Sequence, residues 1–202
     1  MRGDSITAWG KDEPEPSAKG GARMTESDNP PISTRRGDDG TTTLLGAGRL
    51  SKADAPIVVL GDIDEASSFL GLARVEASTA GASGMANLLL DLQRLVYRVM
   101  GDVAMPKEQN FIVEGDVAFL DDSLEEWRGR TDLPNEFVIP GGSRLGALLD
   151  VARSVVRRAE RSLVAGGYAE AHPEALRAVN RLSDLLFVLA RNADGRHDLS
   201  RG

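Results

Sequence analysis

Five stretches of this sequence, lying between residues 62 and 189, repeat apolar side chains at the three- and four-residue spacing of an amphipathic helix. The clearest stripe runs through Leu88, Leu92, Leu95, Val99 and Val103. Mostly short polar or glycine-containing segments join the stripes, so consecutive helices can pack against one another in antiparallel fashion. The sequence therefore predicts an all-α protein, folded as a five-helix bundle.

The expected helices begin at recognisable signals. Asp62 followed by Glu65 forms a capping-box pattern at the start of the first helix. Ser143 can cap the fourth helix, and Pro173 suits the first turn of the fifth. The predicted helices span residues 62–73, 88–103, 117–127, 143–163 and 173–189.

The two ends of the chain differ from its middle. Residues 1–31 are rich in Gly, Pro, Ser and charge, with Trp9 as their only large aromatic, so they bury too little apolar surface to offset the entropy of ordering. Residues 32–56 are rich in Gly and Thr and lack a helical period. We expect a disordered tail over 1–31, a helical-bundle domain over 32–194 that opens with an ordered glycine-rich loop or strand-like arm, and a flexible C-terminal tail over 195–202.

The composition excludes several classes of protein. A net charge of -7 provides no basic surface for nucleic acid. No apolar run approaches the roughly 20 residues that cross a bilayer. The absence of cysteine excludes disulfide scaffolds, thiolate metal sites and cysteine nucleophiles, and it fits a reducing compartment. We therefore expect a cytoplasmic protein that binds neither nucleic acid nor membranes.

One face of the predicted helix 143–163 carries charged residues that could form a binding site. Arg153, Arg157 and Glu160 lie within an arc of roughly 60°, because each residue of a helix advances about 100° around its axis. The two arginines repel each other, so an acidic partner or a bound anion is expected to meet them. A solvated charged face is the alternative. Three further charged residues are expected to point more toward solvent: Asp150, Arg158 and Arg161.

The segment from Arg35 to Thr43 is a candidate phosphate-binding loop. It combines glycines, hydroxyls and basic residues, which suit backbone amides that curl around phosphate oxygens. It lacks the Gly-x-x-x-x-Gly-Lys-Ser/Thr pattern of a Walker loop, so a plain surface turn is the alternative.

Other polar residues on the predicted helices have two interpretations each. Asp64 is expected in a first helical turn, where the helix dipole favours a carboxylate, or as an ion-pair partner of the fourth helix. Asn180 and Asp184 share one face of the fifth helix, where an ordinary satisfied polar contact is the commoner explanation.

The histidines limit the possible chemistry. The chain has only His172, in a predicted loop, and His197, in the predicted tail. Ferritin-like di-iron proteins need Glu-x-x-His pairs on facing helices, and Ser-His-Asp hydrolases need a ring beside the nucleophile. The sequence therefore argues against both classes and predicts no metal-ligating residues.

Five short motifs occur in order along the chain. They are Thr34 to Thr42, Gly61 to Glu65, Phe137 to Ser143, Ala152 to Arg161, and Asn180 to Asp184. Together they resemble the PduO-type ATP:cob(I)alamin adenosyltransferases, over roughly residues 32–194.

The resemblance implies a fold and an activity. Proteins of this family are five-helix bundles, ferritin-like in arrangement, that assemble as homotrimers with each active site between adjacent subunits. They transfer the 5′-deoxyadenosyl group of ATP, with Mg²⁺, to the cobalt of reduced cobalamin and release triphosphate. ATP and the corrinoid are then the small-molecule partners, and a reductase and a cobalamin-dependent acceptor enzyme are the expected protein partners.

The resemblance also implies roles for individual residues. Lys52, Arg157 and Asn180 would complete the nucleotide site, with Glu160 positioning Arg157. Asp64 would pair with Arg153 across the subunit boundary, and Phe137 would press on the lower face of the corrin. The loop that wraps the triphosphate would use Thr34, Arg35, Arg36, Gly37, Asp38, Gly40, Thr41 and Thr42.

Four positions depart from the usual family pattern. Leu60 replaces a common tyrosine, Ala66 a common leucine, Ser67 a common asparagine, and Asp150 a common histidine. They motivate one alternative, a diverged homologue that binds ATP or corrinoid without efficient turnover. A second alternative, a purely structural bundle, requires the charged stripe to be solvated and idle.

Overall fold

The computed structural model describes residues 33–45, 47–105 and 110–201. Residues 33–35 belong to a separate N-terminal unit, Met1–Arg35, and the architecture below is that of the unit Arg36–Gly202. The tail predicted over residues 1–31 lies outside the described residues.

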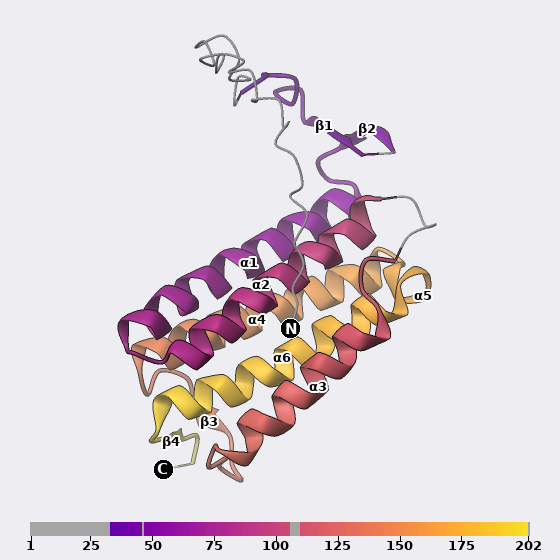
Figure 1. Ribbon diagram of the computed structural model, residues 1–202. Coiled ribbons are helices and arrows are strands. Elements are labelled where there is room, and N and C mark those ends of the chain that lie inside the picture. Colours follow the sequence, from indigo (N-terminus) through magenta and orange to yellow (C-terminus); the bar gives the residue numbers. More distant parts are fainter. Residues whose placement is uncertain (1–32, 46, 106–109, 202) are drawn as a thin grey trace, which may run out of the picture. The chain divides into compact units, whose positions relative to one another are not determined.

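Long helices dominate the second unit, and the prediction of an all-α bundle is confirmed (Figure 1). A short additional helix, α5 (Tyr168–Ala171), was not predicted and lies between the last two long helices. The long helices are α1 (Ala55–Thr79), α2 (Ser83–Ala104), α3 (Glu114–Gly129), α4 (Arg144–Ala165) and α6 (Pro173–Asp194).

Two of the predicted helix starts are confirmed. The side chain of Ser143 caps α4 by accepting a hydrogen bond from the Gly146 N–H at 2.9 Å. Pro173 occupies the first turn of α6, where its missing N–H costs no helical hydrogen bond.

The predicted start of the first helix is wrong. α1 begins at Ala55, with Pro56 in its first turn, so Asp62 and Glu65 lie inside the helix. Both carboxylates instead pair with Arg158 of α4, whose Nε donates to Asp62 Oδ1 at 2.9 Å. The error arose because residues three apart lie on one face within a helix as well as at its start.

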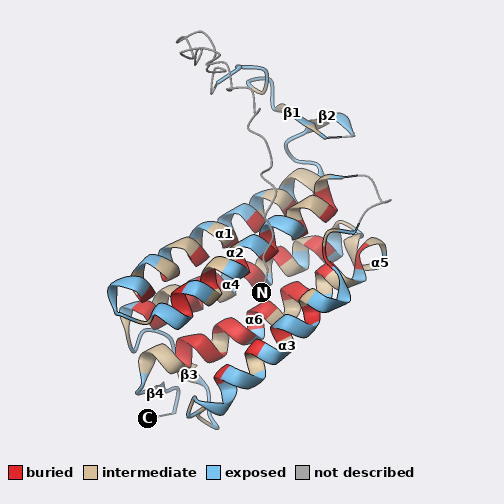
Figure 2. Ribbon diagram, in the orientation of Figure 1, coloured by how far each residue is buried: buried red, intermediate tan, exposed pale blue. Residues whose placement is uncertain are grey.

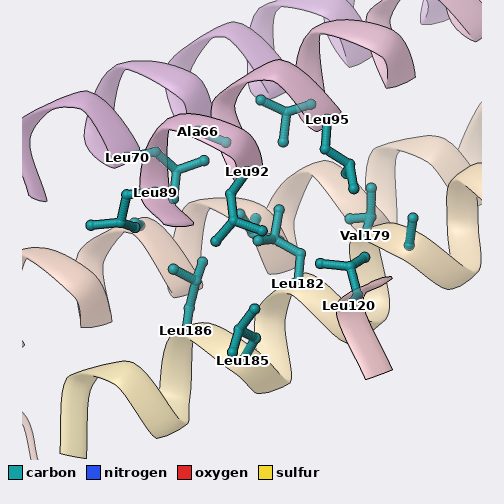
Figure 3. Close-up of a cluster of buried hydrophobic side chains, with 14 of the residues drawn as sticks. Ala66, Leu70, Leu89, Leu92, Leu95, Leu120, Val179, Leu182, Leu185 and Leu186 are labelled. Atoms are coloured by element: carbon teal, nitrogen blue, oxygen red, sulfur yellow. The ribbon is translucent and has the colours of Figure 1, made fainter. Parts of the chain in front are cut away.

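The helices bury their apolar stripes against one another. α1 packs between α2 and α4, α4 packs between α1 and α6, and α6 also contacts α3. Figure 2 shows the buried residues gathered on the inward faces of these helices. Leucines fill much of this core, each contributing about 1.5–3 kcal/mol when fully buried. Those labelled in Figure 3 include Leu70, Leu89, Leu92, Leu182 and Leu186.

Two small antiparallel sheets flank the helices. The segment predicted as a strand-like arm forms the first hairpin, β1 (Thr41–Leu44) and β2 (Gly48–Ser51), with Thr41 opposite Ser51. In the other sheet, β3 (Val138–Ile139) pairs with β4 (Asp198–Leu199), which follows it only after α4, α5 and α6. Part of the segment predicted as a C-terminal tail is therefore paired with the loop that precedes α4.

The two small sheets lie at opposite ends of the bundle (Figure 1). Leu44 and Leu45 of the first hairpin line a small cavity together with His172, which immediately precedes α6. β4 follows the other end of α6, whose 22 residues span about 33 Å. Among the described helices, none combines the length and the apolar character that a bilayer crossing requires.

Candidate functional site

The glycine-rich loop before β1 is folded back onto β2. Gly40 adopts a positive φ of 82°, which favours glycine, and its N–H donates to the Gly37 carbonyl at 3.2 Å. The Gly40 carbonyl in turn accepts a hydrogen bond from the Lys52 N–H at 2.9 Å. The loop is thus an ordered turn closed by Lys52, the residue that follows β2.

Lys52 is fixed to this loop through its side chain. Its Nζ donates to the Gly37 carbonyl at 2.8 Å. A Cβ atom at Gly37 would lie 3.0 Å from the Thr41 carbonyl and 3.2 Å from Lys52 Nζ, so glycine permits this close approach. The structure therefore brings together the predicted site residues Gly37, Gly40 and Lys52.

A second set of contacts in the loop centres on Asp39. Its carboxylate accepts hydrogen bonds from the Thr41 hydroxyl at 2.7 Å and the Thr41 N–H at 3.0 Å, and pairs with Arg49 at 2.9 Å. The Thr41 hydrogen bonds, followed by the charge of Arg49, hold the pKa of Asp39 below its usual range. Arg49 also donates to the Arg36 carbonyl at 2.9 Å. Arg49 was not predicted, because only the hairpin register places it beside Asp39.

The predicted charged stripe of α4 meets α6. Glu160 accepts a hydrogen bond from Asn180 Nδ2 at 2.9 Å, which joins two predicted site residues. Arg157 is exposed, one turn before Glu160, and both line an open cavity of about 300 Å³ together with Arg161. Part of the stripe is therefore engaged with α6, through Glu160, and is not idle solvated surface. The cavity beside Arg157 is open, so the stripe does not form a closed site within one chain.

Phe137 is the most prominent apolar group at the other end of the bundle. Its side chain is 86% exposed, in the loop before β3, although an exposed aromatic of this size is costly in water. A cavity of about 430 Å³ adjoins it, and Arg153, Phe187 and Arg191 also line this cavity. Phe137 and Arg153 are thus brought together by the fold.

Asp150 lies elsewhere than predicted. It is only 3% exposed, although it was expected to point toward solvent. Its Oδ1 accepts a hydrogen bond from Arg153 Nε at 3.0 Å, and its Oδ2 pairs with Arg191 at 2.5 Å. The prediction from helical spacing was wrong because the last turns of α6 cover this side of α4. They also supply Arg191, which pairs with the buried carboxylate.

Arg158 and Arg161 were also expected toward solvent. Arg158 is instead part of the pairing with Asp62 and Glu65 described above, and the hydrogen bond to Asp62 raises the pKa of Arg158. Arg161 is exposed as predicted, and it donates to the Arg157 carbonyl at 2.9 Å.

The remaining predicted residues are Asp64, three residues of the loop region and two residues of the N-terminal unit. Asp64 is exposed on α1, and its carboxylate forms no ion pair with any residue in the described part of the chain. Arg36, Asp38 and Thr42 lie in or beside the glycine-rich loop. Thr34 and Arg35 belong to the N-terminal unit, in which Arg35 has a positive φ of 55°.

Comparison with known proteins places this arrangement in a family. Residues 32–193 match the family described as Cobalamin adenosyltransferase. The chain belongs to this family. The chain is 42% identical over 161 residues to a cobalamin adenosyltransferase from Cupriavidus metallidurans, covering 79% of this chain and 86% of the relative. It is 38% identical over 169 residues to a corrinoid adenosyltransferase from Bacillus subtilis, covering 81% and 86%.

Solved structures of the cobalamin adenosyltransferase family share the fold. A variant of the PduO-type ATP:corrinoid adenosyltransferase from Lactobacillus reuteri, complexed with cobalamin and ATP, superposes with a TM-score of 0.78 at 28% identity. The match covers 85% of this chain and 97% of that one. The predicted family and the predicted corrinoid adenosyltransferase activity are therefore confirmed, and the comparisons lend no support to a homologue without turnover.

Proposed function

We propose that this cobalamin adenosyltransferase assembles its active site from two neighbouring copies of the chain. The observation that carries the proposal is the separation of its two halves. The glycine-rich loop and Lys52 flank the hairpin β1–β2 at one end of the bundle, Phe137 precedes β3 at the other, and α6 between these ends is about 33 Å long. A loop from one copy that meets α4 of a second copy brings both halves to one substrate pair, as in a homotrimer.

The nucleotide half would use the polar groups of the loop and of α4. Lys52 and the loop from Gly37 to Thr42 suit the phosphate oxygens of ATP, with Arg36, Asp38 and Thr41 in the same segment. Arg157 supplies an exposed cation to the departing triphosphate. Glu160, which accepts a hydrogen bond from Asn180 and lines the same cavity as Arg157, would help to position Arg157.

The corrinoid half would use Phe137 and Arg153. An exposed aromatic beside a 430 Å³ cavity offers an apolar face to the flat corrin ring and excludes a lower ligand from the cobalt. Asp64 of a neighbouring copy would pair with Arg153, which gives this exposed carboxylate the cationic partner that the described residues of its own chain do not provide.

The reaction needs these residue types. The reduced cobalt of the substrate donates its electron pair to the ribose C5′ of ATP, the C5′–O bond breaks, and triphosphate leaves with the bonding pair. No proton moves, so no general base is needed. The protein must hold the two substrates in line and offset the negative charge that grows on the leaving group, which is the role proposed for Arg157 and Lys52.

Magnesium would enter with the nucleotide. No group of three or more acidic or histidine side chains among the described residues is arranged to hold a metal ion. Mg²⁺ commonly binds phosphate oxygens and waters, with only one or two protein carboxylates. The loop residues fit this arrangement, since the ion would offset triphosphate charge beside Lys52.

Turnover of reduced cobalamin tests the proposal. With ATP, Mg²⁺ and chemically reduced cobalamin, the corrin absorbance should change to that of adenosylcobalamin. An equimolar mixture of the Lys52→Ala and Phe137→Ala chains should regain part of the activity that each variant lacks alone. At some interfaces of the mixed assembly, the Phe137→Ala chain supplies an intact Lys52 and the Lys52→Ala chain supplies an intact Phe137. Arg177→Ala, which removes an exposed ion pair with Glu174, is the control and should behave as the wild type. A monomer with full activity, or no regain on mixing, would reject the shared site.

Two partner enzymes would act before and after the adenosyl transfer. A cobalamin reductase would supply the reduced cobalamin, and an acceptor enzyme would receive the adenosylcobalamin.

A further inference from the structure

A buried chain of charges connects the end of α6 to the cavity beside Phe137. The side chain of Arg191 is 1% exposed and pairs with two carboxylates, Asp150 at 2.5 Å and Asp194 at 2.9 Å. Asp150 also pairs with Arg153 at 3.0 Å. The order of contacts is therefore Asp194, Arg191, Asp150, Arg153, with two negative and two positive groups in alternation.

Each buried member of this chain needs its neighbours. A charge removed from water is tolerated only where opposite charges and hydrogen bonds replace the solvent. Arg191 has lost its water and is compensated by both carboxylates. Asp150 is equally buried, and it divides its two oxygens, giving Oδ2 to Arg191 and Oδ1 to Arg153. Arg191 of α6 therefore fixes the position of the Asp150 carboxylate through their ion pair.

Close approach of α4 and α6 makes this possible. A Cβ atom at Gly146 would lie 2.6 Å from the Asp194 carboxyl carbon, and one at Gly142 would lie 3.0 Å from the same atom. These glycines leave space for Asp194, whose Oδ1 also accepts a hydrogen bond from Ser143 at 3.1 Å. The charge chain is therefore anchored at the capped start of α4.

Arg153 ends the chain at the cavity. Its side chain is 27% exposed, and the cavity lining includes both Arg153 and Phe137. Asp150 binds its Nε, and the two Nη groups have no hydrogen-bond partner in the described part of the chain. A guanidinium held by its Nε edge keeps a defined orientation, since rotation about the side chain would break that bond.

We infer that Asp150 is a positioning residue for corrinoid binding. The Asp150 carboxylate accepts a hydrogen bond from Arg153 Nε and so fixes the orientation of the guanidinium. The two Nη groups of Arg153 then stay directed to the hydrogen-bond acceptors in the corrinoid half of the site. Arg191 in turn holds Asp150. This inference rests on the proposed function and assigns a role to a position where the chain departs from its family.

Substrate kinetics distinguish positioning from a general structural role. In Asp150→Asn, which keeps the shape and removes the charge, the KM for reduced cobalamin should rise about tenfold while the KM for ATP stays within about twofold. Asp150→Glu keeps the charge and should recover part of the loss. Asp62→Asn is the matched control, because it weakens an ion pair on another face of α4 and should leave both KM values unchanged. An unchanged KM for cobalamin, or an equal rise in both KM values, would overturn the inference.

A second measurement does not depend on turnover. Proton exchange at the Arg153 Nε–H, followed by NMR, should be slow in the wild type and at least about tenfold faster in Asp150→Asn. Equal exchange rates would reject the positioning contact even if the enzyme is active. An inactive wild type with protected Nε–H would reject the proposed function and leave the contact established. If Asp150→Asn does not fold, Asp150→Glu carries both measurements, with intermediate values expected.

Discussion

Glu160 of α4 accepts a hydrogen bond from the side-chain amide of Asn180 on α6 at 2.9 Å. The contact lies one turn beyond Arg157, on the same edge of α4. Both residues line the same cavity, so we propose that this fixed carboxylate helps to position the guanidinium of Arg157. The pair therefore links the packing of two core helices to the candidate nucleotide site.

Loss of the Asn180 amide should weaken nucleotide binding. In Asn180→Ala, Glu160 loses its donor, and we expect a stability loss of about 1 kcal/mol in urea unfolding. The affinity for MgATP, measured by calorimetry, should fall about fivefold because Arg157 is less well positioned. Arg177→Ala on the same helix removes only an exposed ion pair and should bind MgATP as the wild type does. Wild-type affinity in Asn180→Ala would contradict the assigned role.

A methyl group at Gly37 should disturb the loop and spare the helices. The added Cβ would meet the Thr41 carbonyl at 3.0 Å, and this backbone atom cannot move without opening the turn. We expect the MgATP affinity of Gly37→Ala to fall about tenfold with an unchanged helical circular dichroism spectrum. Gly115→Ala, where the added atom has open space, is the control. An unaltered affinity in Gly37→Ala would show that the loop does not need this close approach.

The loop should become less ordered in acid. The Thr41 hydroxyl, the Thr41 N–H and Arg49 lower the pKa of Asp39, so its folded value lies below the unfolded value of about 3.9. The carboxylate therefore stabilises the loop above about pH 4, and this contribution is lost as the pH falls through the folded pKa. The Thr41 amide resonance should titrate with a midpoint below about pH 4. The same resonance should not follow this titration in Asp39→Asn, and a midpoint above the unfolded value would contradict the prediction.

Alanine at Gly146 should strongly destabilise the bundle. The added Cβ would lie 2.6 Å from the Asp194 carboxyl carbon, so α4 and α6 must separate or Asp194 must leave Arg191. Overpacking of this kind typically costs about 1–3 kcal/mol, to be measured by urea unfolding. Gly84→Ala in α2, where the added atom meets nothing, should not lower the stability. Equal stability of the two variants would show that Asp194 moves freely.

Local sequence patterns determined the helices. The apolar stripes predicted five long helices, and Ser143 and Pro173 start α4 and α6 as expected. These signals are reliable because apolar spacing and capping act within a few residues of one another. The same locality explains the error at Asp62, since two carboxylates three residues apart fit both the start and the interior of a helix.

The family motifs named the candidate site residues, and only the tertiary structure decided their surroundings. Asp150 looked solvent-facing on a helical wheel, but Arg191 lies 41 residues away in sequence and packs beside it. Arg49 reaches Asp39 only through the register of the first hairpin. Burial and ion pairing depend on which distant segments meet, and the spacing of residues within one helix carries no information about that.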